Sequence, residues 1–176
     1  MSITVRPAVE ADAAAVVPLI AREVARGTVL PHVFRPEEFL VAEVDGDVVG
    51  TLSLAAWTPG VVELGTVIAA VSGRGVGSRL VEAGLRRAAA EGAHTAVVLT
   101  GVPGWFASLG FTALGATPWA RARGLSTIPP IRDPALDDAI SAKSARSCAR
   151  CPHLAGCTQA LLCFSLPARA QAQEAA

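Results

Sequence analysis

The sequence of 176 residues contains no tyrosine and a single lysine, Lys143, and aromatic residues make up only 5% of it. Charged residues are also scarce, at 17%, and 15 basic side chains balance 15 acidic ones. A net charge of zero gives no electrostatic reason to expect a nucleic acid or an anionic membrane as a partner. The missing tyrosine removes one type of catalytic acid from the chain.

Long apolar runs are also absent. No run reaches the ~18 residues that a transmembrane helix needs, and the first residues lack the basic-then-apolar pattern of a secretion signal. We therefore expect a cytoplasmic protein without a membrane partner. Because 52% of the residues are hydrophobic, a chain of this length can bury a sizeable core. We expect a single domain over residues 1–167, followed by a tail over 168–176.

Hydrophobic periodicity predicts a mixed α/β fold that begins with an antiparallel meander. Asp45-Gly46 between two β-rich runs is a strong hairpin signal. A glycine-rich loop, a helix through Glu91 and a buried strand over His94–Thr100 then follow. Such a unit needs a crossover, which makes the strands before and after the helix parallel neighbours. The strands expected in the meander are Phe39–Val44, Val48–Ala56 and Val61–Val71.

The second half of the chain is less regular. We expect a short helix over Pro103–Leu109 and a strand over Phe111–Leu114, which complete a core over residues 3–115. The segment that follows is rich in proline, arginine and serine and has weak periodicity, as is typical of a loop. The remaining expectations are a linker over about 116–147, a cysteine-rich insertion over 148–157 and a last strand over about 159–166.

The glycine-rich loop contains Gly73, Gly75 and Gly77 between a strand end and a helix start. Glycine lets a backbone approach a ligand closely, and the unpaired N–H groups of a helix N-terminus attract an anion. Arg74 adds a positive charge that a phosphate can use. The loop lacks the Gly-Lys-Ser/Thr of a P-loop, and Ser78 breaks the spacing of a dinucleotide-binding fingerprint. A tight turn without a ligand is the alternative interpretation of these glycines.

Three neighbouring segments together resemble the GNAT superfamily of N-acetyltransferases, namely VELGTVIAAVSGRGVGSRLVEAGLRRAAAEGA, VVLT and PGWFASLGF. The resemblance covers Ile3 to about Leu114. It implies a mixed, mostly antiparallel sheet with a central parallel strand pair, flanked by helices. Within the superfamily the chain resembles the short amino-acid N-acetyltransferases of the N-acetylglutamate synthase type. The segments that carry this narrower resemblance are LP before FLVAEVDGDVVG, PGWF and CARCPHLAGC.

The resemblance implies that an acetyl group passes directly from acetyl-CoA to an amine in a ternary complex. We expect a small-molecule acceptor, with an amino acid before other amines. The pyrophosphate of acetyl-CoA would lie on the glycine-rich loop, and its thioester oxygen would meet backbone N–H groups of the preceding strand. The acetyl-CoA-binding residues implied in this way are Val67, Ile68, Ala69, Ser72, Gly73, Arg74, Gly75, Val76, Gly77, Ser78 and Phe106.

The expected reaction needs a base and an acid. The acceptor amine must lose a proton before it attacks, which requires a carboxylate or an ordered water near the strand. Glu63 is the candidate base, and a solvated strand residue is the alternative interpretation. In this fold a tyrosine often protonates the leaving thiolate. Phe106 stands at that place here, so Ser108 or a water is the expected substitute.

Three positions depart from the pattern of the relatives. Ser72 stands where the loop usually begins with glutamine or arginine. Gly65 and His32 replace two arginines of the glutamate-specific relatives, which could grip a carboxylate by bidentate pairing. These departures argue against glutamate as the substrate. They also leave open a catalytically degenerate module that binds coenzyme A or a partner as a sensor. Dimers are common in this fold, so a homodimer is a further expectation.

All four cysteines lie within one stretch of 16 residues. The spacing of Cys148, Cys151 and Cys157 suits tetrahedral ligation of zinc, with His153 or Cys163 as the fourth ligand. An iron–sulfur cluster would use the same thiolates. Because relatives carry a similar Cys-x-x-Cys segment, we favour one structural zinc ion that holds this loop. A redox switch and a plain loop that happens to contain thiols are the alternatives.

Overall fold

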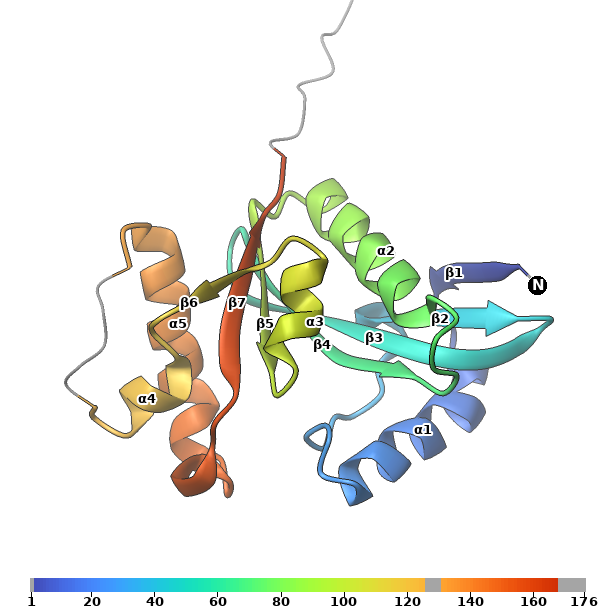
Figure 1. Ribbon diagram of the computed structural model, residues 1–176, viewed down its shortest axis with the longest axis horizontal. Helices are drawn as coiled ribbons and strands as arrows, with labels where there is room; N and C mark the ends of the chain where they lie inside the picture. Colours follow the sequence, from blue (N-terminus) through green and yellow to red (C-terminus); the bar gives the residue numbers. More distant parts are fainter. Residues whose placement is uncertain (1, 126–130, 168–176) are drawn as a thin grey trace, which may run out of the picture.

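The computed structural model describes residues 2–125 and 131–167, and within them seven strands form one sheet in the order β1-β2-β3-β4-β5-β7-β6 (Figure 1). Neighbouring strands are antiparallel except β4 and β5, which are parallel. The expected mixed sheet with a parallel pair is therefore confirmed. The strands are β1 Ile3–Pro7, β2 Phe39–Val44, β3 Asp47–Thr58, β4 Val61–Ala69, β5 Thr95–Thr100, β6 Thr112–Leu114 and β7 Ala160–Ser165.

Helices cover both faces of this sheet (Figure 1). In the part of the chain that the structure describes, no helix has the length and apolar character needed to cross a membrane. The tail expected over 168–176 lies outside the described residues. The α-helices are α1 Ala13–Ala25, α2 Val76–Ala90, α3 Pro103–Ser108, α4 Pro118–Ala122 and α5 Pro134–Arg146; short 3-10 turns are η1 Glu10–Asp12, η2 Pro36–Glu38, η3 Cys148–Arg150 and η4 Leu154–Gly156.

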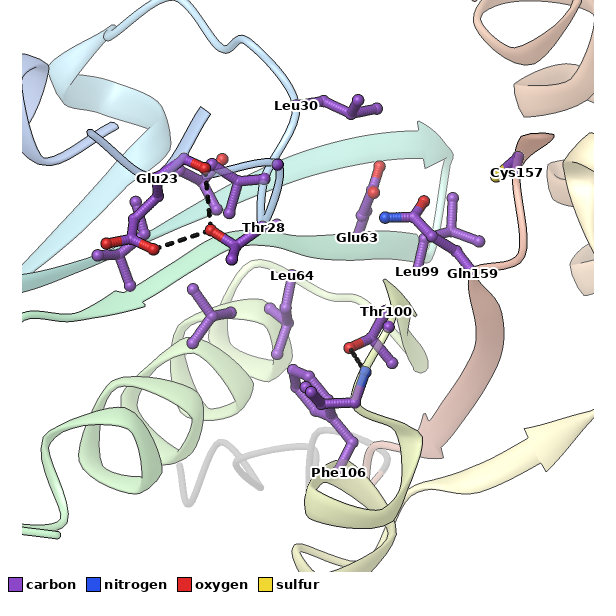
Figure 2. Close-up of a pocket in the computed structure, with 18 of the residues that line it drawn as sticks. Glu23, Thr28, Leu30, Glu63, Leu64, Leu99, Thr100, Phe106, Cys157 and Gln159 are labelled. Carbon is purple, nitrogen blue, oxygen red and sulfur yellow. Dashed lines mark hydrogen bonds between the residues drawn. The ribbon is translucent and has the colours of Figure 1, made fainter. Parts of the chain in front are cut away.

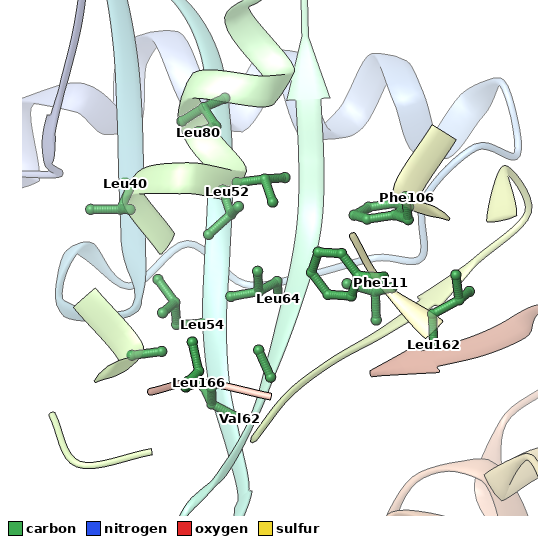
Figure 3. Close-up of a cluster of buried hydrophobic side chains, with 14 of the residues drawn as sticks. Leu40, Leu52, Leu54, Val62, Leu64, Leu80, Phe106, Phe111, Leu162 and Leu166 are labelled. Carbon is green, nitrogen blue, oxygen red and sulfur yellow. The ribbon is translucent and has the colours of Figure 1, made fainter. Parts of the chain in front are cut away.

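One face of the sheet packs against α2 and α3 through a large hydrophobic cluster (Figure 3). Alternate residues of a strand point to opposite faces. Leu64 of β4 therefore joins Leu80 of α2 and Leu52 of β3 in this cluster. Gly84 permits the close packing of α2, because a Cβ atom at this position would lie 3.1 Å from Cδ2 of Leu52.

The opposite face is covered by two separate helices. Val16 and Ile20 of α1 pack against Phe39 of β2 in one cluster. Ile140 of α5 belongs to a second cluster, which includes Val61 of β4. The helices α1 and α5 thus cover different parts of the same face, and the intervening part of β4 remains accessible between them.

The expectation of a linker over about 116–147 is wrong, because the helices α4 and α5 occupy much of this segment. Asp133 caps α5, since its side chain accepts hydrogen bonds from two backbone N–H groups of the first turn, and Pro134 occupies the first helical position. The buried side of α5 mixes large apolar residues with small ones, so its hydrophobic contrast is weak and its periodicity is hard to detect. These buried residues are Leu136, Ala139, Ile140 and Ser144.

Candidate active site

The sheet opens between β4 and β5. The two strands pair only over Val61–Glu63 and Thr95–Val97. Beyond this point β4 continues beside β3, and β5 continues beside β7. The facing backbone edges border a cleft with a volume of about 1060 Å³. Figure 2 shows Glu63 in this cleft between Thr28, which follows α1, and Gln159, which precedes β7.

A β-bulge distorts β4 where it borders the cleft. One residue of β3, Leu52, lies opposite two residues of β4, Thr66 and Val67. Thr66 has φ 47°, a rare conformation for a β-branched residue. Its Oγ1 atom lies 3.2 Å from Oγ of Ser53 and 3.2 Å from Nδ1 of His32. These contacts stabilise the bulge. The bulge interrupts the pairing of β4 with β3 and leaves part of the β4 backbone accessible to a ligand.

His32 and Gly65, the two positions where the resemblance implied arginine in the glutamate-specific relatives, lie at this bulge. His32 contacts Thr66 through one ring nitrogen, and its other nitrogen lies 3.5 Å from a carboxylate oxygen of Glu38. At Gly65 a Cβ atom would lie 3.0 Å from Oγ of Ser53, so the position is already tight. The structure therefore uses His32 to support the backbone, and neither position presents a guanidinium to the cleft.

The glycine-rich loop forms one end of the cleft, which we call the loop end. Ser72 and Gly77 line it. Gly75 is the N-cap of α2 and has φ 76°, in the left-handed region that side chains rarely adopt. Val76 is 1% exposed, so only its backbone can serve a ligand. The free N–H groups and the dipole of α2 favour an anion at this place.

The predicted acetyl-CoA residues are brought together along this part of the cleft. Phe106 is buried and packs edge-on against Trp105, with ring centroids 4.7 Å apart. Gly73, Arg74, Gly75, Val76 and Ser78 form the adjoining loop and the first turn of α2. Those that line the cleft directly are Val67, Ile68, Ala69, Ser72, Gly77 and Phe106.

Ser108 is not brought to the cleft. It is exposed at the end of α3, and its hydroxyl donates a hydrogen bond of 2.6 Å to the carbonyl of Trp105. The described residues that line the cleft do not include it. Of the two expected proton sources for a leaving thiolate, Ser108 and water, Ser108 is therefore not placed to act.

Glu63 lies at the opposite end of the cleft, where α5 approaches; we call this the α5 end. Strand alternation directs Glu63 to the same face as Val61, toward α5. Its Oε2 atom accepts hydrogen bonds of 2.7 Å from Nε1 of Trp57 and 2.7 Å from Nζ of Lys143. The Lys143 ammonium also lies 5.3 Å from the centroid of the Trp57 ring, within the range of a cation–π contact. The side chains of Glu63 and Lys143 are 15% and 22% exposed, so the pair is partly desolvated.

Lys143 and Trp57 are site residues that no sequence pattern indicated. Lys143 follows Ile140 by three positions, which places it on the packed side of α5. One signal was available, because Lys143 is the single lysine of the chain. Without an α5 helix in the expected fold, nothing linked this lysine to a glutamate on β4.

The charges that line the cleft are few. Glu23, Glu63 and Lys143 are the charged side chains among the described residues of the lining. Glu23 accepts a hydrogen bond of 2.8 Å from Thr28, which is the main cause that lowers the pKa of its carboxyl group. It also pairs with Arg22 and Arg26 on the outside of α1. Lys143 is therefore the one cation in this lining that a bound anion can meet.

The zinc site expected from the cysteine spacing is not formed. Among the described residues, no group of three or more His, Cys, Asp or Glu side chains is arranged to hold a metal ion. Cys148, Cys151 and Cys157 instead line the α5 end of the cleft, whereas His153 is exposed and outside the lining. Burial raises the pKa of the Cys148 thiol above its ordinary value. Cys163 lies in β7, and burial likewise raises the pKa of its thiol.

The family model described as acetyltransferase (GNAT) family matches residues 18–115. No curated protein matches the chain significantly in sequence.

Several solved structures share the fold. Rv2747 from Mycobacterium tuberculosis, in complex with CoA and NLQ, is 24% identical with a TM-score of 0.70; the match covers 93% of this chain and 99% of that chain. N-acetylglutamate synthase from Neisseria gonorrhoeae, complexed with coenzyme A and N-acetyl-glutamate, is 21% identical with a TM-score of 0.69, over 95% of this chain and 36% of that chain. The chain thus spans about a third of the length of that synthase. The yncA protein from Salmonella typhimurium, with acetyl-CoA, is 18% identical with a TM-score of 0.62 and 97% coverage of both chains.

Proposed function

The chain belongs to the acetyltransferase (GNAT) family, and we propose that it transfers the acetyl group of acetyl-CoA to the amine of an amino acid. The family makes the protein an N-acetyltransferase, as the glycine-rich loop and the PGWFASLGF segment indicated. The observation that carries the choice of acceptor is the pair of Glu63 and Lys143 at the α5 end of the cleft.

The loop end of the cleft fits acetyl-CoA. The N-terminus of α2 and the left-handed Gly75 offer backbone N–H groups to the pyrophosphate. The open edge of β4 over Val67–Ala69 offers unpaired backbone groups to the pantetheine chain and to the thioester oxygen. Coenzyme A or acetyl-CoA is bound in the three similar structures named above, which supports this assignment.

The α5 end of the cleft fits a zwitterion. Glu63 and Lys143 offer one negative and one positive group side by side, with Nζ and Oε2 2.7 Å apart. An amino acid carries the complementary pair, because its ammonium can bind Glu63 while its carboxylate binds Lys143. The N-acetyl-glutamate in the Neisseria gonorrhoeae synthase supports an amino-acid-like acceptor. His32 and Gly65, which replace arginines, argue for a side chain other than that of glutamate.

Glu63 then has a defined part in the reaction. It removes a proton from the bound ammonium, directly or through a water, and the free amine attacks the thioester carbonyl. The carbon–sulfur bond breaks, and the thiolate takes a proton from water because Phe106 has none to give. Trp57 and Lys143 keep the Glu63 carboxylate in place through hydrogen bonds to Oε2.

A matched panel of acceptors tests this proposal. Release of free coenzyme A is measured for each amino acid, for its carboxamide and for the amine that remains after decarboxylation. We expect kcat/KM to fall at least ~10-fold when the carboxylate is absent, because a hydrogen bond to a charged group contributes about 1.5–3 kcal/mol. Equal rates would overturn the amino-acid acceptor but keep the transferase.

A separate binding measurement tests the alternative of a catalytically degenerate sensor module. Isothermal titration with acetyl-CoA reports on the loop end without requiring turnover. Binding of acetyl-CoA without turnover of any acceptor would favour the degenerate module that binds coenzyme A as a sensor.

A further inference from the structure

Lys143 places a primary amine inside the cleft where acetyl transfer takes place. Its Nζ atom lies 2.7 Å from Oε2 of Glu63, the carboxylate proposed to bind the ammonium of an external acceptor. It lines the same cleft as Val67–Ala69, the backbone assigned to the thioester. The lysine side chain has a flexible four-carbon stem and is 22% exposed, so it is not fully enclosed by its neighbours.

We propose that the protein acetylates its own Lys143 when no external acceptor occupies the α5 end. The inference rests on the proposed function, because acetyl-CoA and Glu63 are its two requirements. Lys143 would then be both the anchor for an acceptor carboxylate and the site of a covalent modification that removes this anchor.

The reaction uses the chemistry already described for the external acceptor. Glu63 takes one proton from the Lys143 ammonium, and the free amine attacks the thioester carbonyl of acetyl-CoA. A carbon–nitrogen bond forms, the carbon–sulfur bond breaks, and the leaving thiolate of coenzyme A is protonated by water. The products are Nε-acetyl-lysine at position 143 and free coenzyme A.

The modification would change the α5 end. An acetylated Lys143 has no charge, so it loses the ion pair with Glu63 and the cation–π contact with Trp57. Among the described residues, the cleft lining then keeps Glu23 and Glu63 as charged groups but no cation. Acceptors with a carboxylate would bind more weakly, whereas the loop end would be unaffected.

The sequence makes this inference simple to test, because Lys143 is the single lysine. The full chain is incubated with acetyl-CoA and no acceptor, and its intact mass is followed over time. We expect one added acetyl group, assigned to Lys143 by peptide mapping, at a rate per molecule that does not depend on protein concentration. An amino acid that is turned over should suppress the modification.

Two variants and one control separate self-acetylation from chemical background. Lys143→Arg should take up no acetyl group, and Glu63→Gln should lower the rate about 100-fold. The chain unfolded in urea with the same acetyl-CoA gives the uncatalysed rate at Lys143. A rate in the folded protein that is no faster than this, or acetylation confined to the α-amino group, would overturn the inference.

The same experiment also distinguishes a failure of self-acetylation from a failure of the proposed function on which it rests. Titration of acetyl-CoA reports binding in the same samples. If acetyl-CoA binds and an external amine is turned over while Lys143 stays unmodified, self-acetylation is wrong and the proposed function stands. If acetyl-CoA does not bind, both are wrong.

Discussion

The two ends of the cleft are built in different ways. The loop end comes from one continuous part of the chain, from the bulge of β4 through the glycine-rich loop to α3, and it offers mainly backbone groups. The α5 end is assembled from side chains that lie far apart in the sequence. Glu63 and Lys143, for example, are separated by 80 positions.

This difference predicts different responses to substitution. Backbone recognition at the loop end depends on conformations that glycine permits, so a side chain matters there mainly by its shape. Recognition at the α5 end depends on charge and hydrogen bonds, so a change that conserves shape is sufficient to impair it. Substitutions at the two ends should therefore separate donor binding from acceptor chemistry.

The largest expected effect is a decrease in kcat caused by a substitution at the α5 end of the cleft. Glu63→Gln keeps the shape of the side chain but removes the proposed base, and we expect kcat to fall by about 10²–10⁴-fold. The affinity for acetyl-CoA should not change, because Glu63 lies outside the loop end. Steady-state kinetics and calorimetry measure the two quantities.

Glu82→Gln is the matched control for this change. Glu82 pairs with Arg86 on the exposed side of α2, away from the cleft lining. If Glu63→Gln retained the wild-type pH–rate profile, proton removal would have to be assigned to bulk water.

A smaller effect is expected on donor affinity at the loop end. Gly75→Val forces a β-branched residue into the left-handed region, at a cost of about 1–3 kcal/mol. If the loop changes its conformation to relieve this strain, we expect the Kd for acetyl-CoA to rise about 100-fold. A rise of this size corresponds to a loss of about 2.7 kcal/mol in binding free energy. Isothermal titration measures this change.

Gly92→Val controls for strain alone. Gly92 has φ 89° and, like Gly75, no atom within 4 Å of its missing Cβ, but it lies outside the cleft lining. An equal loss of affinity in both variants would show that general destabilisation, rather than the loop, weakens binding.

The smallest effect on activity is expected from a substitution of Asp12, the residue that immediately precedes α1. Asp12 is buried and accepts hydrogen bonds of 2.8 Å from both terminal nitrogens of Arg6. Asp12→Ala should lower the free energy of unfolding by about 2 kcal/mol, because it removes charged hydrogen bonds. Neither kcat nor the Kd for acetyl-CoA should change, since Asp12 does not line the cleft.

This ion pair also gives the stability a defined pH dependence. Hydrogen bonds from Arg6 are the main cause that lowers the pKa of Asp12 below its ordinary value of 3.8. The contribution of Asp12 is therefore complete above that value and is lost as the pH falls through the lower pKa of the folded state. Denaturant unfolding at neutral and acidic pH should show a smaller pH effect in Asp12→Ala than in Asp47→Ala, an exposed control at the β2–β3 hairpin.

Most of the fold could be predicted because its signals are local. The Asp45-Gly46 turn, the β-rich runs beside it and the glycines before α2 each specify a short-range conformation. The helix α5 was missed because its buried side contains Ala139 and Ser144 beside larger residues, and its local signals were limited to the cap at Asp133 and the proline that follows it.

The cysteine segment shows why spacing alone is insufficient for a site. Three thiols within ten residues can converge on a metal only if the backbone turns them toward one point. The turns η3 and η4 instead leave Cys148, Cys151 and Cys157 along the wall of the cleft. Ser108 is similar, because its helix turns the hydroxyl to the carbonyl of Trp105.

The sequence by itself determined the family, the order of the strands along the chain and the loop end of the cleft. The family follows from the resemblance of three sequence segments, whereas the strands and the loop end depend on steric limits and backbone hydrogen bonds that act between residues close in the chain. Tertiary structure alone decided the α5 end. The partner of Glu63 depends on the packing of α5 against β3 and β4, which brings Lys143 and Trp57 to one carboxylate oxygen. Charges attract at any separation along the chain, so only the packed fold selects which of them meet.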